Sequence, residues 1–349
     1  MDPITQGVLG ASVGEAVGRR RKIGAAATLA ALAGMAPDLD VLIRSESDPL
    51  LFLEYHRQFT HALAFVPIGA LLCAGLFHLL ARRWLRFGGT YLFCFLGYAT
   101  HGLLDACTTY GTQLLWPFSD RRIAWNSISV IDPLFTVPAL GLVLLAVLRR
   151  SPLPARFALV WMAGYLTLGF VQQARVEAAG EALAAARGHG GVNVSAKPGF
   201  ANLLLWKVVY EHEGWFHVDA VRAGLAVRTY PGERAERLDL ARHLPWLEAD
   251  SQQARDVERF RWFSADQLAW RPGHPDEVVD VRYSLLPNEI EPLWGLRLDP
   301  RAGPDAHADY WAARSVTPEK QARFVAMLRG EAEDAPAGEA PEREALGGG

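Results

Sequence analysis

The chain has 349 residues, enough for two domains, and 50% of them are hydrophobic. Its formal net charge is −3, so it lacks the overall basic field that supports nucleic-acid binding, and we expect no nucleic-acid partner. Nearly all long apolar runs fall before residue 175, and the remainder has the composition of a soluble domain. The sequence therefore predicts a multi-pass α-helical membrane domain followed by a smaller α+β soluble domain.

Six apolar segments make up the predicted membrane domain. The first two are rich in Gly and Ala and are shorter than the roughly 20 residues needed to span a bilayer. They form either ordinary core helices or a close-packed hairpin in which small residues let backbones approach, and the membrane-like segments after them favour the hairpin. The six segments are residues 3–18, 23–36, 61–80, 88–107, 131–148 and 157–171.

The cysteines and the N-terminus argue against a disulfide framework and a signal peptide. Cys73, Cys94 and Cys107 lie in or beside apolar segments and form no CxxC motif, so they are expected to be small buried side chains and not a disulfide or zinc framework. The first residues, MDPITQG, include no basic stretch and no small-residue cleavage site. We therefore expect no removable signal peptide, and insertion through the apolar segments themselves.

Basic clusters predict the orientation of the chain. They occur at residues 19–22, 82–86 and 149–156, which are alternate connections between the apolar segments. By the positive-inside rule these connections are cytoplasmic, so the part of the chain after the last segment is extracytoplasmic. Only Arg121 and Arg122 depart from the pattern.

Residues 1–173 are thus predicted to be the membrane domain and residues 174–330 an extracytoplasmic α+β domain that begins with a juxtamembrane helix. The mixture of strands and helices in the second domain is typical of antiparallel pairing. Residues 331–349 are rich in Ala, Glu, Pro and Gly and are expected to be disordered. The predicted strands are 201–211, 215–221, 225–230, 278–285 and 293–298, and the predicted helices are 250–263 and 318–329.

The most informative pair is His101 and Asp105, four positions apart within an apolar segment. On a helix this spacing places both on one face, one turn apart. Ionisable residues in a membrane-like helix are costly and usually mark a metal, a proton path or a buried polar contact. His78, in the preceding segment, has no such neighbour and is interpreted as structural.

Four further residues join this pair on the predicted outer side: Asp38, Asp40, His56 and His61. The Asp pair is weak alone, since Asp after Pro is common at turns, and the His pair is a stronger signal that could still come from ordinary interfacial side chains. Together the six offer three imidazoles and three carboxylates, the mixed ligands that suit Zn, Mn or Fe. Six candidates allow two metal ions, or one ion with supporting residues.

A metal at this position would activate water and polarise a phosphoryl or carbonyl oxygen. We expect Asp38, His61, Asp105 and Asp120 to take part in catalysis. Arg57, Arg121 and Arg122 could hold an anionic substrate group.

At these residues the chain resembles a family, the membrane-bound, metal-dependent hydrolases usually labelled YdjM-like. The matching stretches are MDPITQGVLGA, PDLDVLI, HRQFTHAL, HGLLDACTTYGTQLLWPFSDRR and SVIDPLFT, and the resemblance covers about residues 1–173. It implies an integral protein of the bacterial inner membrane. It also implies a metal site made by Asp38, Asp40, His56, His61, His101 and Asp105.

The function expected from these features is hydrolysis of an ester or phosphoester, with a lipid-linked substrate suggested by the membrane setting alone. One or two divalent ions, Zn or Mn, would be the cofactor, and membrane lipid a partner. One alternative is a proton-coupled transporter, against which the polar residues gather at one face and no inverted repeat is present. Another is a non-catalytic scaffold with a structural metal, whose C-terminal domain binds a protein partner.

Overall fold

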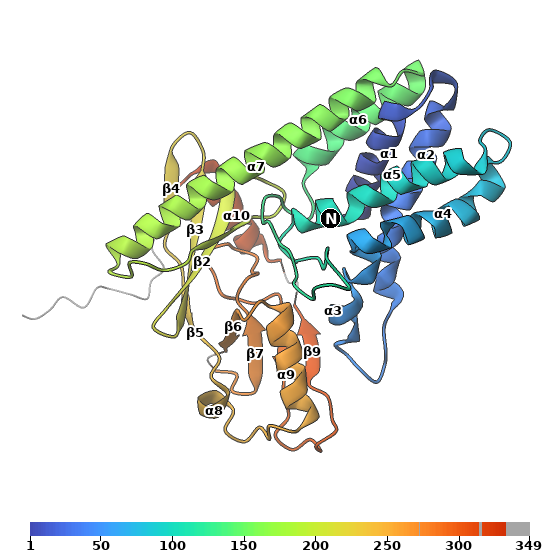
Figure 1. The fold of residues 1–349 in the computed structure, drawn as a ribbon. Helices are drawn as coiled ribbons and strands as arrows, with labels where there is room; N and C mark the ends of the chain where they lie inside the picture. The colour runs from blue at the N-terminus through green and yellow to red at the C-terminus, as the bar shows by residue number, and fades with distance from the viewer. Residues whose placement is uncertain (272, 314–315, 333–349) are drawn as a thin grey trace, which may run out of the picture.

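The computed structural model describes all residues except 272, 314–315 and 333–349. Helices form the N-terminal half, and two antiparallel sheets form most of the C-terminal half (Figure 1). The predicted order of a helical region and a sheet-rich domain is therefore confirmed. The predicted disordered tail lies, from residue 333 onward, outside the described residues.

Six long helices correspond to the six predicted apolar segments. One differs at its start: the segment predicted from residue 61 becomes helical only at Val66, because residues 59–65 form two 3₁₀ turns and Pro67 occupies the first helical turn. The helices are α1 (Pro3–Val17), α2 (Ile23–Met35), α4 (Val66–Ala81), α5 (Phe87–Ala106), α6 (Pro133–Arg149) and α7 (Leu153–Ala186). Short elements between them are η1 (Arg20–Lys22), η2 (Ala36–Leu42), α3 (Leu51–Tyr55), η3 (Phe59–His61) and η4 (Leu63–Phe65).

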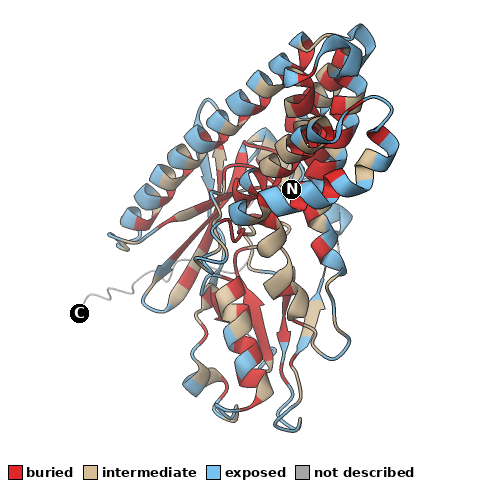
Figure 2. Cartoon of the chain, turned by 45° about the vertical axis from the view of Figure 1, so that its right-hand side comes forward, coloured by how far each residue is buried: buried red, intermediate tan, exposed pale blue. Residues whose placement is uncertain are grey.

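Among the described residues, three helical stretches are long and apolar enough to cross a membrane: Arg20–Leu42, Leu63–Ala81 and Leu153–Ala186. Helix α6 is apolar but shorter. The outer surfaces of these helices are largely exposed in Figure 2, and on α4 the side chains of Leu72, Leu76 and Leu79 are 65–67% exposed. Apolar surface of this extent indicates contact with something other than water.

Helices α2 and α5 approach at backbone distance. A Cβ atom added at Gly97 would lie 2.0 Å from the carbonyl oxygen of Ala30, so only glycine fits there. Small residues allow helices to pack this closely. The end of α2, and the η2 turn that continues it, is thereby held beside the middle of α5.

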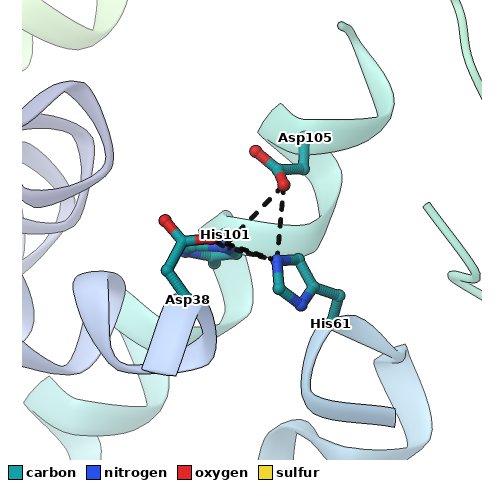
Figure 3. Close-up of side chains that lie close together, drawn as sticks. All are labelled: Asp38, His61, His101 and Asp105. Carbon is teal, nitrogen blue, oxygen red and sulfur yellow. Dashed lines mark hydrogen bonds and ion pairs between the residues drawn. The ribbon is translucent and has the colours of Figure 1, made fainter. Parts of the chain in front are cut away.

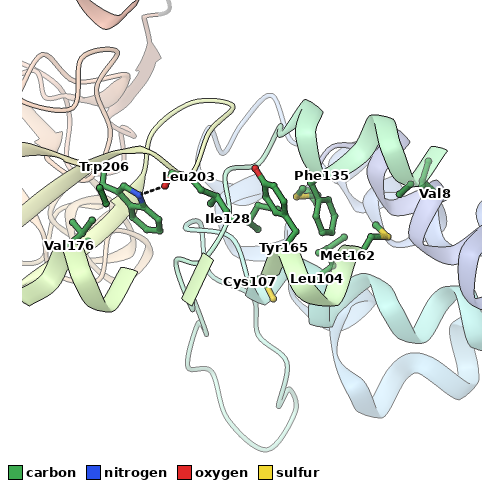
Figure 4. Packing of buried hydrophobic residues seen from close by; sticks show 14 of the residues in the cluster. Val8, Leu104, Cys107, Ile128, Phe135, Met162, Tyr165, Val176, Leu203 and Trp206 are labelled. Atoms are coloured by element: carbon green, nitrogen blue, oxygen red, sulfur yellow. Dashed lines mark hydrogen bonds between the residues drawn. The ribbon is translucent and has the colours of Figure 1, made fainter. Parts of the chain in front are cut away.

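Helix α7 is a single helix of 34 residues that runs without interruption across residue 173 and out over the first sheet (Figure 1). Val176 of this helix lies in the same buried cluster as Trp206 of that sheet (Figure 4). One helix therefore belongs to both the helical region and the core of the sheet-rich domain.

The first sheet has the order β1-β2-β3-β4, with β5 also paired to β3, and the second has the order β6-β7-β8-β9. Each strand pair is antiparallel, as predicted. The strands are β1 (Ser195–Pro198), β2 (Leu205–His212), β3 (Trp215–Ala223), β4 (Val227–Tyr230), β5 (Arg234–Glu236), β6 (Leu268–Trp270), β7 (Glu277–Asp280), β8 (Trp294–Arg297) and β9 (Asp309–Ala312). The helices are α8 (Leu240–His243), α9 (Gln252–Phe263) and α10 (Pro318–Arg329). Strands β1, β5, β6 and β9, of three or four residues each, were not predicted.

The second sheet is anchored to the helical region through α3. Leu50 and Leu53 are buried with Val257 and Phe260 of α9. Beside them, the guanidinium of Arg259 is paired with Asp48 and Glu54. These contacts hold the second sheet against the end of the helical region that carries the polar residues.

Candidate metal centre

Four of the predicted ligands converge. Asp38 comes from η2, His61 from η3, and His101 and Asp105 from one face of α5 (Figure 3). One ligand atom from each side chain lies within 4.8 Å of the other three. Three segments separated by up to 67 positions thus meet at one point.

The distances between these atoms suit a single ion. Nε2 of His61 lies 3.5 Å from Oδ1 of Asp38 and 3.3 Å from Oδ2 of Asp105. Nε2 of His101 lies 3.4 Å and 3.9 Å from the same two oxygens, respectively. Four ligands at bond lengths of about 2 Å in a tetrahedron would be separated by about 3.3 Å. The arrangement therefore has the size of a tetrahedral metal site.

Two further features of the cluster fit a cation. The Nε2 atoms of His61 and His101 lie 2.8 Å apart, and both face the same two carboxylates. Oδ2 of Asp105 is buried, and its ion pair with Nε of Arg57 at 2.9 Å lacks the geometry of a hydrogen bond. A divalent ion between these groups would satisfy that oxygen and accept both imidazole lone pairs.

The other nitrogen of each imidazole is held in place. Nδ1 of His101 lies 2.5 Å from the carbonyl oxygen of Gly34, a geometry in which the ring donates. Nδ1 of His61 lies 2.9 Å from the hydroxyl of Thr60 and 3.3 Å from Oδ2 of Asp40. Metal-binding imidazoles are commonly oriented in this way by carbonyls and carboxylates.

Asp40 and His56, predicted as ligands, lie one step outside the four-residue cluster. Oδ1 of Asp40 lies 2.7 Å from Nδ1 of His56, and its Oδ2 accepts hydrogen bonds from the hydroxyl of Thr60 and the backbone N–H of Arg57. Asp40 is buried, whereas the His56 side chain is 31% exposed. The structure thus places Asp40 as a support for His61 and His56.

Two backbone features make this geometry possible. Arg57 has a φ of 66°, an uncommon conformation for a residue with a side chain, and it directs its N–H to Asp40. A Cβ atom added at Gly102 would lie 2.2 Å from the carbonyl oxygen of His61, so glycine is needed for the His61 turn to approach α5. A strained backbone conformation, such as the positive φ of Arg57, often occurs at functional sites.

Asp105 has partners that the sequence reasoning missed. Its Oδ1 accepts a hydrogen bond of 2.8 Å from Gln6 and contacts the α-amino group of Met1, and its Oδ2 lies 2.9 Å from Nε of Arg57. Gln6 is fully buried in a helix whose other residues, apart from Glu15, are small or apolar. That isolated amide was a signal available in the sequence.

The cluster borders a cavity of 590 Å³ through Asp38. The side chains of His61, His101 and Asp105 are 0% exposed, whereas Asp38 is 17% exposed and lines the cavity. Helical and sheet-rich parts both contribute to the wall. The lining residues include Val41, Phe52, Leu53, His56, Arg57, Tyr110, Arg122, Ile131, Phe263, Trp294 and Tyr310.

Two of the three predicted anion-binding arginines line this cavity. The guanidinium of Arg122 donates to the carbonyls of Leu53 and Gly111 and lies over the rings of Trp262 and Phe263. Burial lowers the pKa of Arg122 to about 9, and the neighbouring guanidiniums of Arg57 and Arg282 add to the effect. Arg122 is therefore still a cation at neutral pH.

Asp120 and Arg121 lie elsewhere. Both are exposed on the loop that follows Pro117, and neither lines the cavity. The structure does not bring them to the four-residue cluster, so the catalytic role expected for Asp120 has no geometric support.

Comparisons with known proteins agree with the first half of this description. The model of the family described as YdjM inner membrane protein matches residues 1–176, which confirms the resemblance. The chain is 33% identical over 146 residues to the inner membrane protein YbcI of Escherichia coli, covering 39% of this chain and 77% of YbcI. It is 26% identical over 185 residues to the uncharacterized protein YfhP of Bacillus subtilis, covering 51% of this chain and just over half, 56%, of YfhP. No solved structure matches. Since the family match covers half of the sequence, the chain belongs to the YdjM inner membrane protein family.

Proposed function

We propose that this protein is a membrane-bound, metal-dependent hydrolase acting on an ester or phosphoester. The observation that carries the proposal is the convergence of two imidazoles and two carboxylates beside a cavity that Asp38 lines. Mixed N and O ligands of this kind suit Zn or Mn. A bound divalent ion would supply Lewis acidity and a nucleophilic water at neutral pH.

The residues around the cluster have separate roles in this proposal. His61, His101, Asp38 and Asp105 hold the ion. Gln6 and the ion pair with Arg57 fix the Asp105 carboxylate, so that its Oδ2 stays directed at the cluster. Such supports typically contribute 10–100-fold in metal affinity or activity.

His56 is the proposed proton-transfer group. It lines the cavity beside Asp38, and its Nδ1 is paired with the buried carboxylate of Asp40 at 2.7 Å. This leaves Nε2 free to exchange a proton with substrate, as an imidazole oriented by a carboxylate can do.

The cavity wall suggests the character of the substrate. Arg57 and Arg122 supply positive charge to the cavity lining, while Phe52, Ile131 and Tyr310 supply apolar surface. An anionic group attached to an apolar chain would match both. A lipid-linked ester or phosphoester is therefore the substrate class we propose.

The proposed arrangement in the membrane is multi-pass, with the sheets outside the cytoplasm. The basic turns at 19–22, 82–86 and 149–156 are exposed and lie at the end of the helical region away from the sheets (Figure 1). Basic residues favour the cytoplasmic face. The cluster, at the opposite ends of α2 and α5, would then face the extracytoplasmic side.

One observation favours a second candidate, a structural metal. Four protein ligands complete a tetrahedron, and closed four-ligand sites are typical of structural zinc, whereas catalytic sites keep a position open. Asp38 is the cluster member that is partly exposed. A substitution of Asp38 therefore helps to distinguish a catalytic metal from a structural one.

The test uses the full-length protein in detergent. Hydrolysis of a panel of ester and phosphoester substrates is measured before and after chelation, with Zn or Mn added back, for the wild type and Asp38→Asn. Chelator-sensitive hydrolysis that is restored by metal and lost in Asp38→Asn supports the hydrolase. Stoichiometric metal without hydrolysis across the panel would favour the structural candidate.

A further inference from the structure

A second cavity, of 190 Å³, lies where the first sheet meets the loop that follows α5. It is smaller than the roughly 300–1,000 Å³ of pockets for drug-sized ligands, so it suits a single small chemical group. Its wall includes three cationic side chains, Lys197, Lys207 and Arg282, together with Ser129 and Tyr283.

The two lysines form a cross-strand pair. Lys197 of β1 lies directly opposite Lys207 of β2, and each is only 5% exposed. Like charges directly opposite one another destabilise a sheet, and buried ammonium groups without partners are costly. Such an arrangement points to a counter-ion.

Among the described residues no carboxylate forms an ion pair with either lysine, although Asp280 is near enough to act on both through its charge. Nζ of Lys207 donates to the hydroxyl of Ser284 at 2.7 Å and to the carbonyl of Glu289 at 2.8 Å. Nζ of Lys197 donates only to the hydroxyl of Ser195, at 2.8 Å, within the described residues. An ammonium has three donors, so Lys197 retains unused ones at the cavity.

The third cation is already neutralised. Arg282 is paired with Asp280 at 2.6 Å, and the same Asp280 oxygen accepts a hydrogen bond from the indole of Trp294. Asp280 is thus already engaged by Arg282 and Trp294. Burial lowers the pKa of Lys197 to about 8 and that of Lys207 to about 7, although nearby carboxylates, Asp280 among them, act in the opposite direction.

A neutral donor completes the wall. The hydroxyl of Ser129 accepts a hydrogen bond from the N–H of Ala201 at 3.2 Å, so its own proton is available. The donors therefore come from β1, from β2 and from the loop that carries Ser129. A phosphate group offers oxygens in several directions and matches such a set, whereas a carboxylate offers two in one plane.

We propose that this cavity is a binding site for a phosphate group, held by Lys197, Lys207 and Ser129. Tyr110 and Val130 line both this cavity and the one above the metal cluster, and the ring of Tyr110 stacks on Tyr283 at 5.0 Å. The two sites are thus neighbours. None of the four cluster residues lines the phosphate site, so the proposal does not depend on the metal chemistry.

The test measures binding of inorganic phosphate to the full-length protein in a neutral detergent by calorimetry, at an ionic strength held constant with chloride. Lys197→Met should bind phosphate about 10-fold or more weakly than the wild type, as expected for the loss of a charged hydrogen-bonding partner. Lys197→Arg, which keeps the charge, should recover most of the affinity. Lys22→Met, at an exposed lysine outside the cavity lining, is the control and should bind as the wild type does.

Asp38→Asn separates this site from the metal cluster, because it should leave phosphate binding intact after chelation. Acetate should not compete. If added phosphatidylglycerol competes with phosphate, the natural ligand is a lipid headgroup. If it does not compete, the natural ligand is a soluble phosphate. Both outcomes are consistent with a phosphate site. Equal phosphate affinity in the wild type and in folded Lys197→Met, or loss of binding in Asp38→Asn alone, would overturn the proposal.

Discussion

The Nε2 atoms of His61 and His101 lie 2.8 Å apart, although 40 positions separate the two residues. His61 ends a 3₁₀ turn, and His101 lies on the buried face of a long helix, so the contact joins two independent elements. Both nitrogens also face Asp38 and Asp105. A metal ion is the partner that suits all four side chains at once.

Replacement of His101 by Ala should remove bound metal. One of four ligands is lost, and the remaining three would leave the site open, so metal content should fall from about one ion per chain to background. The measurement is elemental analysis of protein purified in detergent without chelator. His78→Ala is the matched control, because His78 pairs with Thr90 and lies outside the cluster. Equal metal in the two variants would contradict the assignment.

Replacement of Gly102 by Ala should damage the site without touching a ligand. The new Cβ atom would lie 2.2 Å from the carbonyl oxygen of His61 and would push the His61 turn away from α5. We expect a loss of metal affinity of about 10–100-fold, comparable with loss of a supporting contact. Competition with a chromogenic chelator would measure it.

Gly75→Ala provides the control for this substitution. It is also an internal helix position, but a Cβ atom there meets nothing within 4 Å. Ala is favoured over Gly inside helices by about 1 kcal/mol, so this variant should be at least as stable as the wild type and bind metal normally. If both variants bind metal equally well, the close approach at Gly102 is not what positions His61.

The residues that sequence reasoning brought together share a local signal. His101 and Asp105 stood out because an apolar helix carried two ionisable groups on one face. The short motifs that contain Asp38 and His61 were then added to this pair. Which residues of those motifs enter the four-residue cluster, and which support it as Asp40 and His56 do, depends on turn geometry that no local pattern specifies.

The walls of the two cavities could not be predicted for a different reason. Trp294 and Tyr310 reach the metal cavity from the second sheet, and Lys197 faces Lys207 only through strand register. Such contacts join distant parts of the chain. Asp120 shows the converse: it lies near the motif in sequence, yet its loop carries it to the surface.

Lys207 should make stability depend on pH in the sheet-rich domain. Burial lowers its pKa to about 7, with the nearby Lys197 adding to the effect, whereas an unfolded lysine has a pKa of about 10.4. Between about pH 7 and 10 the unfolded chain therefore binds more protons, so this residue's contribution to stability increases as pH rises. Below about pH 7 both states are protonated and the contribution is constant.

Thermal unfolding of the wild type and Lys207→Met in phosphate-free buffer isolates this effect. The wild-type midpoint should rise relative to that of Lys207→Met between pH 7 and 10. Lys22→Met, at an exposed lysine, should show no such trend. A difference between wild type and Lys207→Met that is constant across this range would contradict the lowered pKa.

Reporter fusions test the proposed orientation. A fusion after Arg86, in the basic turn between α4 and α5, should report the cytoplasm. A fusion after Gly190, beyond the end of α7, should report the extracytoplasmic side. The same location for both would overturn the proposed topology, since an odd number of crossings must separate them.

Hydrolytic activity should depend on the ligands and not on nearby nucleophiles. Cys107 lies two residues beyond Asp105, but its thiol is buried and donates to the carbonyl oxygen of Leu103, so it has the setting of an inert structural cysteine. Ser119 lies on the loop beside the exposed Asp120, outside the cavity lining. We therefore expect Cys107→Ala and Ser119→Ala to retain most activity on any ester that proves to be a substrate.

Asp105→Ala and His61→Ala should abolish that activity, because loss of a ligand removes charge stabilisation together with the activated water. Steady-state rates for the four variants, with metal content measured on the same samples, distinguish hydrolysis by metal-activated water from covalent catalysis. A chelator-resistant enzyme that loses activity in Cys107→Ala or Ser119→Ala would instead indicate covalent catalysis. Activity that falls in parallel with metal content, and only in the two ligand variants, is the result expected of water activated by a metal.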